Sequence, residues 1–162
     1  LDQYVGGKGQ GAALALSLWA PDEAHAVAQF LGGESGRYVE SALGAAGLTT
    51  ITQQVAGPTR TCTTLLHDGG ATTELIDPSD PVTEAEVAGL AAQCAAAMKA
   101  YGVVALCGTQ PPGAETLYEQ LAAALPQELP PAGYDIFGEC DTTGEPACPR
   151  TSPLLLLDGY KE

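Results

Sequence analysis

The segment GVVALCG, residues 102–108, is a continuous apolar run between two glycines. A run this short without polar alternation predicts a strand that is covered on both faces. The apolar segments around Val27–Leu31 and before Asp158 predict two more strands. Helices are predicted between the strands, at residues 12–19, 36–46, 83–99 and 114–124. This alternation predicts an α/β domain with a mostly parallel sheet between two layers of helices, and we expect the sheet to end on an uncovered hydrophobic strand.

Local signals place several boundaries. Ser35 is expected to cap the helix at 36–46, and Thr83 followed by Glu86 forms a capping box for the helix at 83–99. The threonine-rich stretch around the turn Asp68–Gly70 predicts an antiparallel hairpin that interrupts the parallel sheet. We assign residues 49–77, approximately, to this β lid.

Composition excludes several classes of protein. The formal net charge of -14 disfavours nucleic-acid binding, because such a surface repels phosphate backbones. The five cysteines form no CxxC pair and predict reduced thiols in a cytoplasmic protein rather than a disulfide scaffold or a metal site. No apolar run is long enough to span a bilayer, so we expect no membrane partner.

Both ends of the sequence are typical of a truncated chain. The sequence starts without Met almost directly at a glycine-rich loop, and it ends shortly after LLLL. We therefore expect one incomplete domain over residues 1–162, with targeting left open. Residues 129–153 contain five of the twelve prolines without clear periodicity, and they predict an exposed insertion.

The loop GGKGQGAA, residues 6–13, has three interpretations. It can be a tight turn without a ligand, a dinucleotide loop of the GxGxxA kind, or an anion or polyol site in which Lys8 adds positive charge to backbone N–H groups. A phosphate-binding Walker loop is excluded, because no GK[ST] follows at the required spacing. The hairpin that carries Thr59 and Arg60 argues against a dinucleotide domain, which would continue with further βα units.

Four ordered segments over residues 3–124 resemble the ribokinase-like (PfkB) carbohydrate kinases. GGKG followed by Ala13 resembles the first family signature, and FLGGESG resembles FVGxDxxG. TRTCTTLLHDGGATTELIDP is similar to the TR…T…TE…P stretch of the subgroup that contains 1-phosphofructokinase and tagatose-6-phosphate kinase. LCGTQPPG is similar to SGSLPPG of the same subgroup.

The resemblance implies a three-layer α/β/α domain with a small β lid, truncated at both ends. It implies an ATP-dependent phosphotransferase that acts on a hydroxyl of a sugar or sugar phosphate, of which this chain supplies the sugar-binding half. The catalytic aspartate would lie beyond Glu162, and ATP and Mg²⁺ would bind mainly to that missing part. This chain alone would then be inactive, with no catalytic or metal-binding residue of its own.

The resemblance also implies a set of substrate-binding residues. Arg60 would hold the phosphate of the sugar through a bidentate contact. Gly11 stands where the family usually has an asparagine that binds the sugar, and Glu34 replaces an aspartate. Asp158 is interpreted as a strand end rather than as a catalytic group. The expected substrate-binding residues are Gly6, Gly7, Lys8, Gly11, Arg60, Thr109 and Gln110.

Two alternatives stay open. The protein can be a non-catalytic, degenerate kinase that binds a sugar phosphate, for which Gly11 is mild support. It can also be a nucleoside kinase of the same fold, although a nucleoside brings no phosphate for Arg60. The exposed edges of the lid are expected to pair with a second subunit in a homodimer.

Overall fold

The computed structural model describes residues 2–125 and 154–159, so the predicted insertion at 129–153 lies outside the described residues. The elements in chain order are α1 (Lys8–Trp19), β1 (His25–Leu31), α2 (Gly33–Ala45), β2 (Thr49–Gln54), β3 (Cys62–Leu66), β4 (Thr72–Ile76), α3 (Glu84–Ala97), the 3₁₀ helix η1 (Met98–Ala100), β5 (Val103–Gly108), α4 (Leu117–Ala124) and β6 (Leu154–Gly159).

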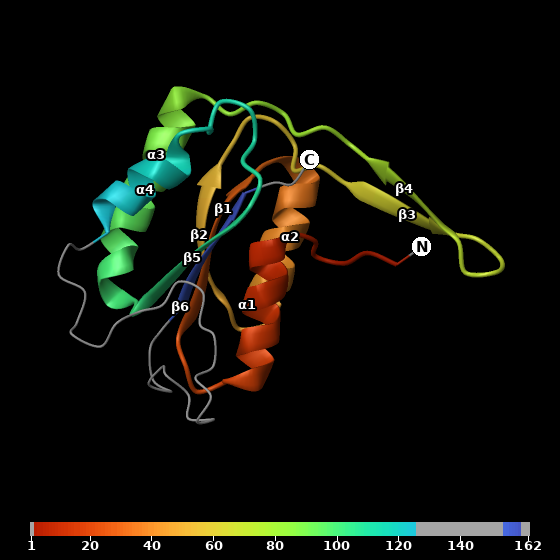
Figure 1. Cartoon of the computed structure of the whole chain (residues 1–162), viewed down its shortest axis with the longest axis horizontal. Coiled ribbons are helices and arrows are strands. Elements are labelled where there is room, and N and C mark those ends of the chain that lie inside the picture. Colours follow the sequence, from red (N-terminus) through yellow and green to blue (C-terminus); the bar gives the residue numbers. More distant parts are fainter. Residues whose placement is uncertain (1, 126–153, 160–162) are drawn as a thin grey trace, which may run out of the picture.

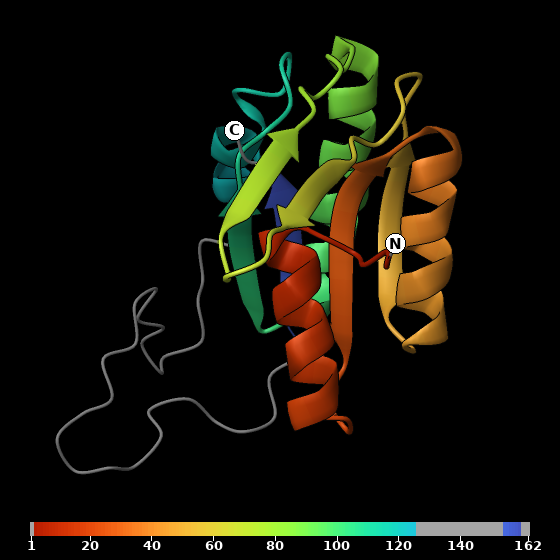
Figure 2. The same cartoon turned by 90° about the vertical axis from the view of Figure 1, so that its right-hand side faces the viewer.

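Four strands form a parallel sheet with the order β2-β1-β6-β5. The helices α1 and α2 cover one face, and α3 and α4 cover the other (Figures 1 and 2). This arrangement confirms the predicted three-layer α/β/α architecture. No helix in the described part of the chain has both the length and the apolar character to cross a membrane.

The strand β1 lies at the centre of the core. Its residues from Ala26 to Leu31 are all buried, as expected for a parallel strand with helices on both faces. Alternate side chains point to opposite faces of the sheet. Ala26, Ala28 and Phe30 pack with α3 and α4, while Val27 packs with α1 and α2. One short strand therefore holds both helical layers together.

The strands β3 and β4 form a separate antiparallel hairpin that projects from the sheet (Figure 1). Their turn contains Gly69 and Gly70, both with positive φ, which confirms the predicted hairpin. The lid is shorter than the predicted range of 49–77, because residues 49–54 form β2 and pair with β1 in the main sheet.

Three helix starts differ from the prediction. The helix α4 begins at Leu117 rather than residue 114, and α2 begins at Gly33 rather than residue 36. The helix α1 begins at Lys8 rather than residue 12, since the Gly11 N–H already donates to the Gly7 carbonyl at 3.0 Å. Ser35 does not cap α2, whose N-cap is Gly32 without a side-chain hydrogen bond. The capping box of Thr83 and Glu86 at α3 is confirmed.

The last strand occupies an unexpected position. The sheet does end on the apolar strand β5, where Leu106 is 38% exposed. The strand β6, however, lies between β1 and β5 and pairs with both. The residue Asp158 is thereby placed at the carboxyl end of a central strand, in register with Cys107.

Candidate functional site

The candidate site lies at the edge of the sheet where the parallel strands end. The segments after β1, β2 and β5 all leave the sheet at this edge, and α1 begins there, at the opposite end from its connection to β1. The hairpin projects from the same edge (Figures 1 and 2). Open α/β sheets bind their ligands at this edge. The fold therefore brings the four segments that carry the family resemblance to one end of the molecule.

The glycine loop forms the start of α1. Gly7 is the N-cap with φ of 111°, and no side chain caps the helix. A Cβ added at Gly6 or at Gly11 would meet no atom within 4 Å. Lys8 is exposed in the first helical turn. The first N–H groups of α1 are thus left without a side-chain acceptor, next to a cation, which suits an anion or a polar ligand.

Thr59 joins the segment after β2 to the start of α2. Its N–H donates to the Gly32 carbonyl at 2.8 Å, and its Oγ1 accepts from the Gly32 N–H at 3.0 Å. The Ser35 hydroxyl donates to the Thr59 carbonyl at 2.5 Å. Residues 55–61, which we call the first arm of the lid, are therefore held at Thr59 by three hydrogen bonds.

The glycines of FLGGESG make this contact sterically feasible. A Cβ at Gly32 would lie 1.9 Å from the Gly57 carbonyl oxygen, and one at Gly33 would lie 3.0 Å from the Pro58 Cβ. A Cβ at Gly36 would lie 3.0 Å from the Thr59 Oγ1. The motif thus allows the backbone of the first arm to approach α2 closely. This contact fixes the backbone at Thr59 and therefore the starting point of the Arg60 side chain.

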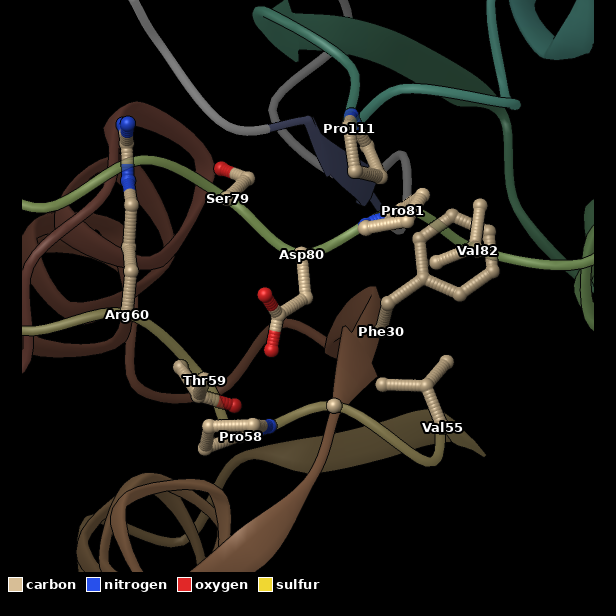
Figure 3. Close-up of a pocket in the computed structure, with 11 residues that line it drawn as sticks. Phe30, Val55, Pro58, Thr59, Arg60, Ser79, Asp80, Pro81, Val82 and Pro111 are labelled. Carbon is tan, nitrogen blue, oxygen red and sulfur yellow. The ribbon is translucent and has the colours of Figure 1, made fainter.

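Arg60 is half-buried at the base of the lid. Figure 3 shows its side chain extending away from the Asp80 carboxylate, which points toward Thr59 and Pro58. Both residues line a cavity of about 10 Å³, which has room for about one water molecule. This cavity is too small for a ligand of several non-hydrogen atoms.

Residues 77–83 form the second arm of the lid, which leads into α3. The Val82 N–H donates to the Pro112 carbonyl at 2.9 Å. Gly113, with φ of 93°, would bring a Cβ to 2.3 Å from the Val82 carbonyl oxygen. The turn PPG after β5 therefore supports the second arm, as the FLGGESG segment supports the first.

Glu86 connects the two arms. Its carboxylate accepts from the Thr83 N–H at 2.7 Å and the Thr83 hydroxyl at 2.8 Å, and from the Ala56 N–H at 3.0 Å. The hydrogen bonds from Thr83, with a smaller effect from Ala56, hold the pKa of Glu86 below its ordinary value. A single ionised carboxylate thus bonds to both arms.

The two predicted residues after β5 differ in their surroundings. Thr109 is exposed at the edge of the sheet. The Gln110 amide is directed toward α4, where it accepts from the Tyr118 N–H at 3.1 Å and donates to the Ala114 carbonyl in the orientation that satisfies both groups. Gln110 therefore supports the start of α4, whereas Thr109 is accessible to a ligand.

Sequence reasoning missed two polar features near this edge. One is the contact of Glu86 with Ala56, which no local pattern encodes. The other is a pair of buried glutamines, Gln10 in the first turn of α1 and Gln29 on β1, joined by a hydrogen bond of 2.9 Å. The sequence feature that could have predicted this pair is Gln29, a polar side chain within an apolar strand.

Metal binding and thiol chemistry have little support in the described residues. No cluster of three His, Cys, Asp or Glu side chains in residues 2–125 and 154–159 could hold a metal ion. Burial raises the pKa of the Cys94 thiol to about 12, so this thiol is not a nucleophile.

Comparison with solved structures gives clear matches, whereas no protein-family model matches the sequence. Phosphofructokinase-2 from Escherichia coli, in a tetrameric inhibited form, superposes with a TM-score of 0.63 and 22% identity over 76% of this chain and 40% of its own. A protein from Staphylococcus aureus described as a phosphofructokinase gives 0.62 and 19%, over 76% and 39%. The Escherichia coli enzyme with fructose-6-phosphate gives 0.56 and 18%, over 71% and 39%.

The matched part of this chain thus spans about two fifths of these proteins. At these identities, the TM-scores of 0.56 to 0.63 show that the fold is shared. The parallel sheet, the two helical layers and the order of elements agree with the fold expected from the four sequence segments. The chain has the ribokinase-like α/β fold of these phosphofructokinases.

Proposed function

We propose that this chain is the sugar-binding part of an ATP-dependent kinase that phosphorylates a hydroxyl of a sugar phosphate. The observation that carries the proposal is the position of Arg60. Three hydrogen bonds at Thr59 hold the residue before it, at the edge of the sheet where α1 begins with uncapped N–H groups. A guanidinium and a bare helix N-terminus at one edge suit a ligand that carries a phosphate and several hydroxyls.

In this proposal each segment has one task. The guanidinium of Arg60 binds the phosphate. The sugar lies against the glycine loop, with its hydroxyls close to the backbone of Gly6, Gly7, Lys8 and Gly11. Thr109 contacts the sugar from the end of β5. Gln110 is a weaker candidate, because its amide is bonded to α4. The lid closes over the ligand and excludes water.

The catalytic base, ATP and Mg²⁺ are assigned to parts of the protein beyond this chain, in the cytoplasm. ATP supplies the phosphoryl group, and helix N–H groups with a metal would stabilise its charge during transfer. In this chain the described residues orient the acceptor sugar. On its own, the chain is expected to bind sugar phosphate without turning it over.

We also propose that a second copy of the protein covers the lid. Both strands of the hairpin are largely exposed, with Leu66 at 81%, Leu75 at 54% and Ile76 at 53%. A two-stranded hairpin is only marginally stable in water by itself, and free edges favour pairing. Sedimentation should detect a dimer that Leu66→Glu weakens. A wild-type monomer at micromolar concentration would contradict this part of the proposal.

The kinase proposal is tested with the full gene product that contains this chain. ADP release is measured with fructose 6-phosphate, fructose 1-phosphate, fructose and adenosine as acceptors. Arg60→Met should raise KM for the phosphorylated acceptor by roughly 10- to 150-fold, the effect of losing a charged hydrogen bond. The matched control is Arg37→Met, which removes an exposed arginine on α2.

The outcomes separate the alternatives. Turnover of a sugar phosphate with the Arg60 effect supports the proposal. Turnover of adenosine without an Arg60 effect identifies a nucleoside kinase. Binding of a sugar phosphate without ADP release identifies a degenerate, non-catalytic kinase. An equal change in KM for Arg60→Met and Arg37→Met would contradict the role of Arg60.

A further inference from the structure

Two buried glutamines lie between the first turn of α1 and the carboxyl end of β1. Gln10 is 7% exposed and Gln29 is 1% exposed. The Gln10 Nε2 donates to the Gln29 Oε1 at 2.9 Å. We call these two residues the buried glutamine pair. Primary amides are rarely placed in a core, because each brings donors and an acceptor that need partners.

Two of the four polar atoms in the two amide groups have no hydrogen-bond partner in the described part of the chain. The Gln10 Oε1 and the Gln29 Nε2 are buried and have no hydrogen-bond partner among the described residues. One acceptor and one donor are therefore unpaired. Exchanging the nitrogen and oxygen of both amides would reverse the inner hydrogen bond and again leave one acceptor and one donor. The unmet requirement does not depend on how the amides are oriented.

The location of the pair connects it to the proposed sugar site. Gln10 is the third residue of α1, directly after Lys8 and Gly9, and Gln29 is two residues before the end of β1. In the register of β1 with β6, Ala28 pairs with Leu157 in the last paired position, so Gln29 directly follows the paired part of β1. The pair therefore lies at the foot of the glycine loop, at the centre of the carboxyl edge.

We propose that the buried glutamine pair binds one hydroxyl group of the sugar, an inference that rests on the proposed function. A hydroxyl donates one hydrogen bond and accepts others, so it can donate to the Gln10 Oε1 and accept from the Gln29 Nε2. A carboxylate has no proton to donate at neutral pH, a phosphate monoester is mostly a dianion there, and an ammonium group cannot accept. Among ligand groups, the hydroxyl matches both unpaired atoms, and a water molecule shares this chemistry.

Access to the pair depends on the first turn of α1. The unpaired atoms are shielded from solvent, so a hydroxyl reaches them only when this turn shifts. Gly7, Gly9 and Gly11 make the turn easy to deform, because glycine is a poor helix former. Gly11 has no side chain to bind a hydroxyl, and the pair supplies amide groups from the neighbouring residue and from β1.

The experiment compares binding of fructose 6-phosphate and its monodeoxy analogues, without ATP, to the full gene product. The double variant Gln10→Leu/Gln29→Leu removes both unpaired atoms and should fold at least as stably as the wild type. Its affinity for fructose 6-phosphate should fall by about 10- to 100-fold. One deoxy analogue should bind the wild type and the variant equally, which identifies the hydroxyl.

The control is Gln53→Leu/Gln93→Leu, which removes a second glutamine–glutamine hydrogen bond, of 3.1 Å, between β2 and α3. It should leave the affinity unchanged. Equal affinities of the wild type and the Gln10→Leu/Gln29→Leu variant for every analogue would overturn the inference and leave a buried water as the partner. Absence of sugar binding by the wild type would overturn it as well.

The inference and the proposed function fail in different ways. Because binding is measured without ATP, a protein that lacks kinase activity can still show the loss of affinity in the double variant. That result would reject the proposed kinase function and support hydroxyl binding by the buried glutamine pair. A working kinase whose KM values for all analogues are unaffected by the double variant would reject the pair and support the kinase.

Discussion

The two glycine clusters of this chain, GGKGQG at residues 6–11 and GGESG at residues 32–36, differ in what surrounds their glycines. In GGKGQG, a Cβ at Gly6 or Gly11 would enter open space. In GGESG, a Cβ at Gly32, Gly33 or Gly36 would lie within 3.0 Å of the first arm of the lid. The second cluster is required by packing inside the protein. In the first cluster, packing does not require glycine at Gly6 or Gly11, and Gly7 is favoured by its φ of 111°.

The two clusters also differ in how they are held in the structure. The GGESG cluster lets the first arm of the lid bond to Gly32 and Ser35, so the position of Arg60 depends on the fold itself. The GGKGQG cluster leaves the start of α1 uncapped and weakly helical. Substitutions in the two clusters should therefore have opposite effects on stability.

The largest effect is expected for Gly32→Ala. The backbone of Gly32 is extended, with φ of −151°, so any residue can adopt it and the cost is steric alone. The new Cβ would force the Gly57 carbonyl away, which should destabilise the protein by about 3 kcal/mol and lower Tm by about 6–12 °C. Chemical denaturation measures the change.

The matched control for this variant is Gly44→Ala, in α2, where a Cβ meets nothing within 4 Å. Alanine should stabilise this helical position by about 0.5–1 kcal/mol. If Gly32→Ala were as stable as Gly44→Ala, the close approach of the first arm to Gly32 would be wrong.

A smaller effect of opposite sign is expected for Gly11→Ala. Alanine at this helical position should raise the free energy of unfolding by about 0.5–1 kcal/mol, because the site has room for a methyl group. The same methyl group should weaken sugar-phosphate binding, measured by calorimetry, if Gly11 lines the sugar. Unchanged binding would remove Gly11 from the site, and a loss of stability would show that the space is already filled.

The smallest effect concerns Glu86, a carboxylate near the surface that joins both arms of the lid. Its pKa is lower in the folded protein than the ordinary 4.5, so its contribution to stability is complete above that value. The contribution is lost as the pH falls from 4.5 through the lowered folded pKa. The Tm of Glu86→Gln, measured by thermal unfolding, should therefore fall less between pH 7 and pH 3 than the Tm of the wild type.

Glu84→Gln provides the control, because Glu84 is exposed in the same helical turn. The Tm of the Glu84→Gln variant should fall between pH 7 and pH 3 by the same amount as the Tm of the wild type. Identical pH profiles for the wild type and Glu86→Gln would mean that the carboxylate does not hold the two arms in solution.

Much of the fold was predictable from local patterns. The apolar runs at β1 and β5, the capping box of Thr83 and Glu86, and the turn at Gly69–Gly70 each depend on residues close in sequence. Local hydrogen bonding and side-chain periodicity are sufficient to specify them. The four segments that resemble the kinase signatures were likewise readable, and the fold that they imply is confirmed.

The site was predicted less completely, because its contacts join residues that are distant in sequence. The Ser35 hydroxyl bonds to the Thr59 carbonyl rather than capping its own helix, and Glu86 reaches Ala56 as well as its own cap. A side chain chooses among such partners only after the elements have packed, and no local pattern records that choice.

The sequence by itself therefore determined the elements, the hairpin and the class of the fold. The tertiary structure alone decided that β6 lies between β1 and β5, that α1 starts at Lys8, and that Gln10 and Gln29 meet in the core. Strand order and buried polar pairs arise from contacts between segments far apart in the chain. Their free energy depends on the shared burial of those segments, which a single stretch of sequence does not contain.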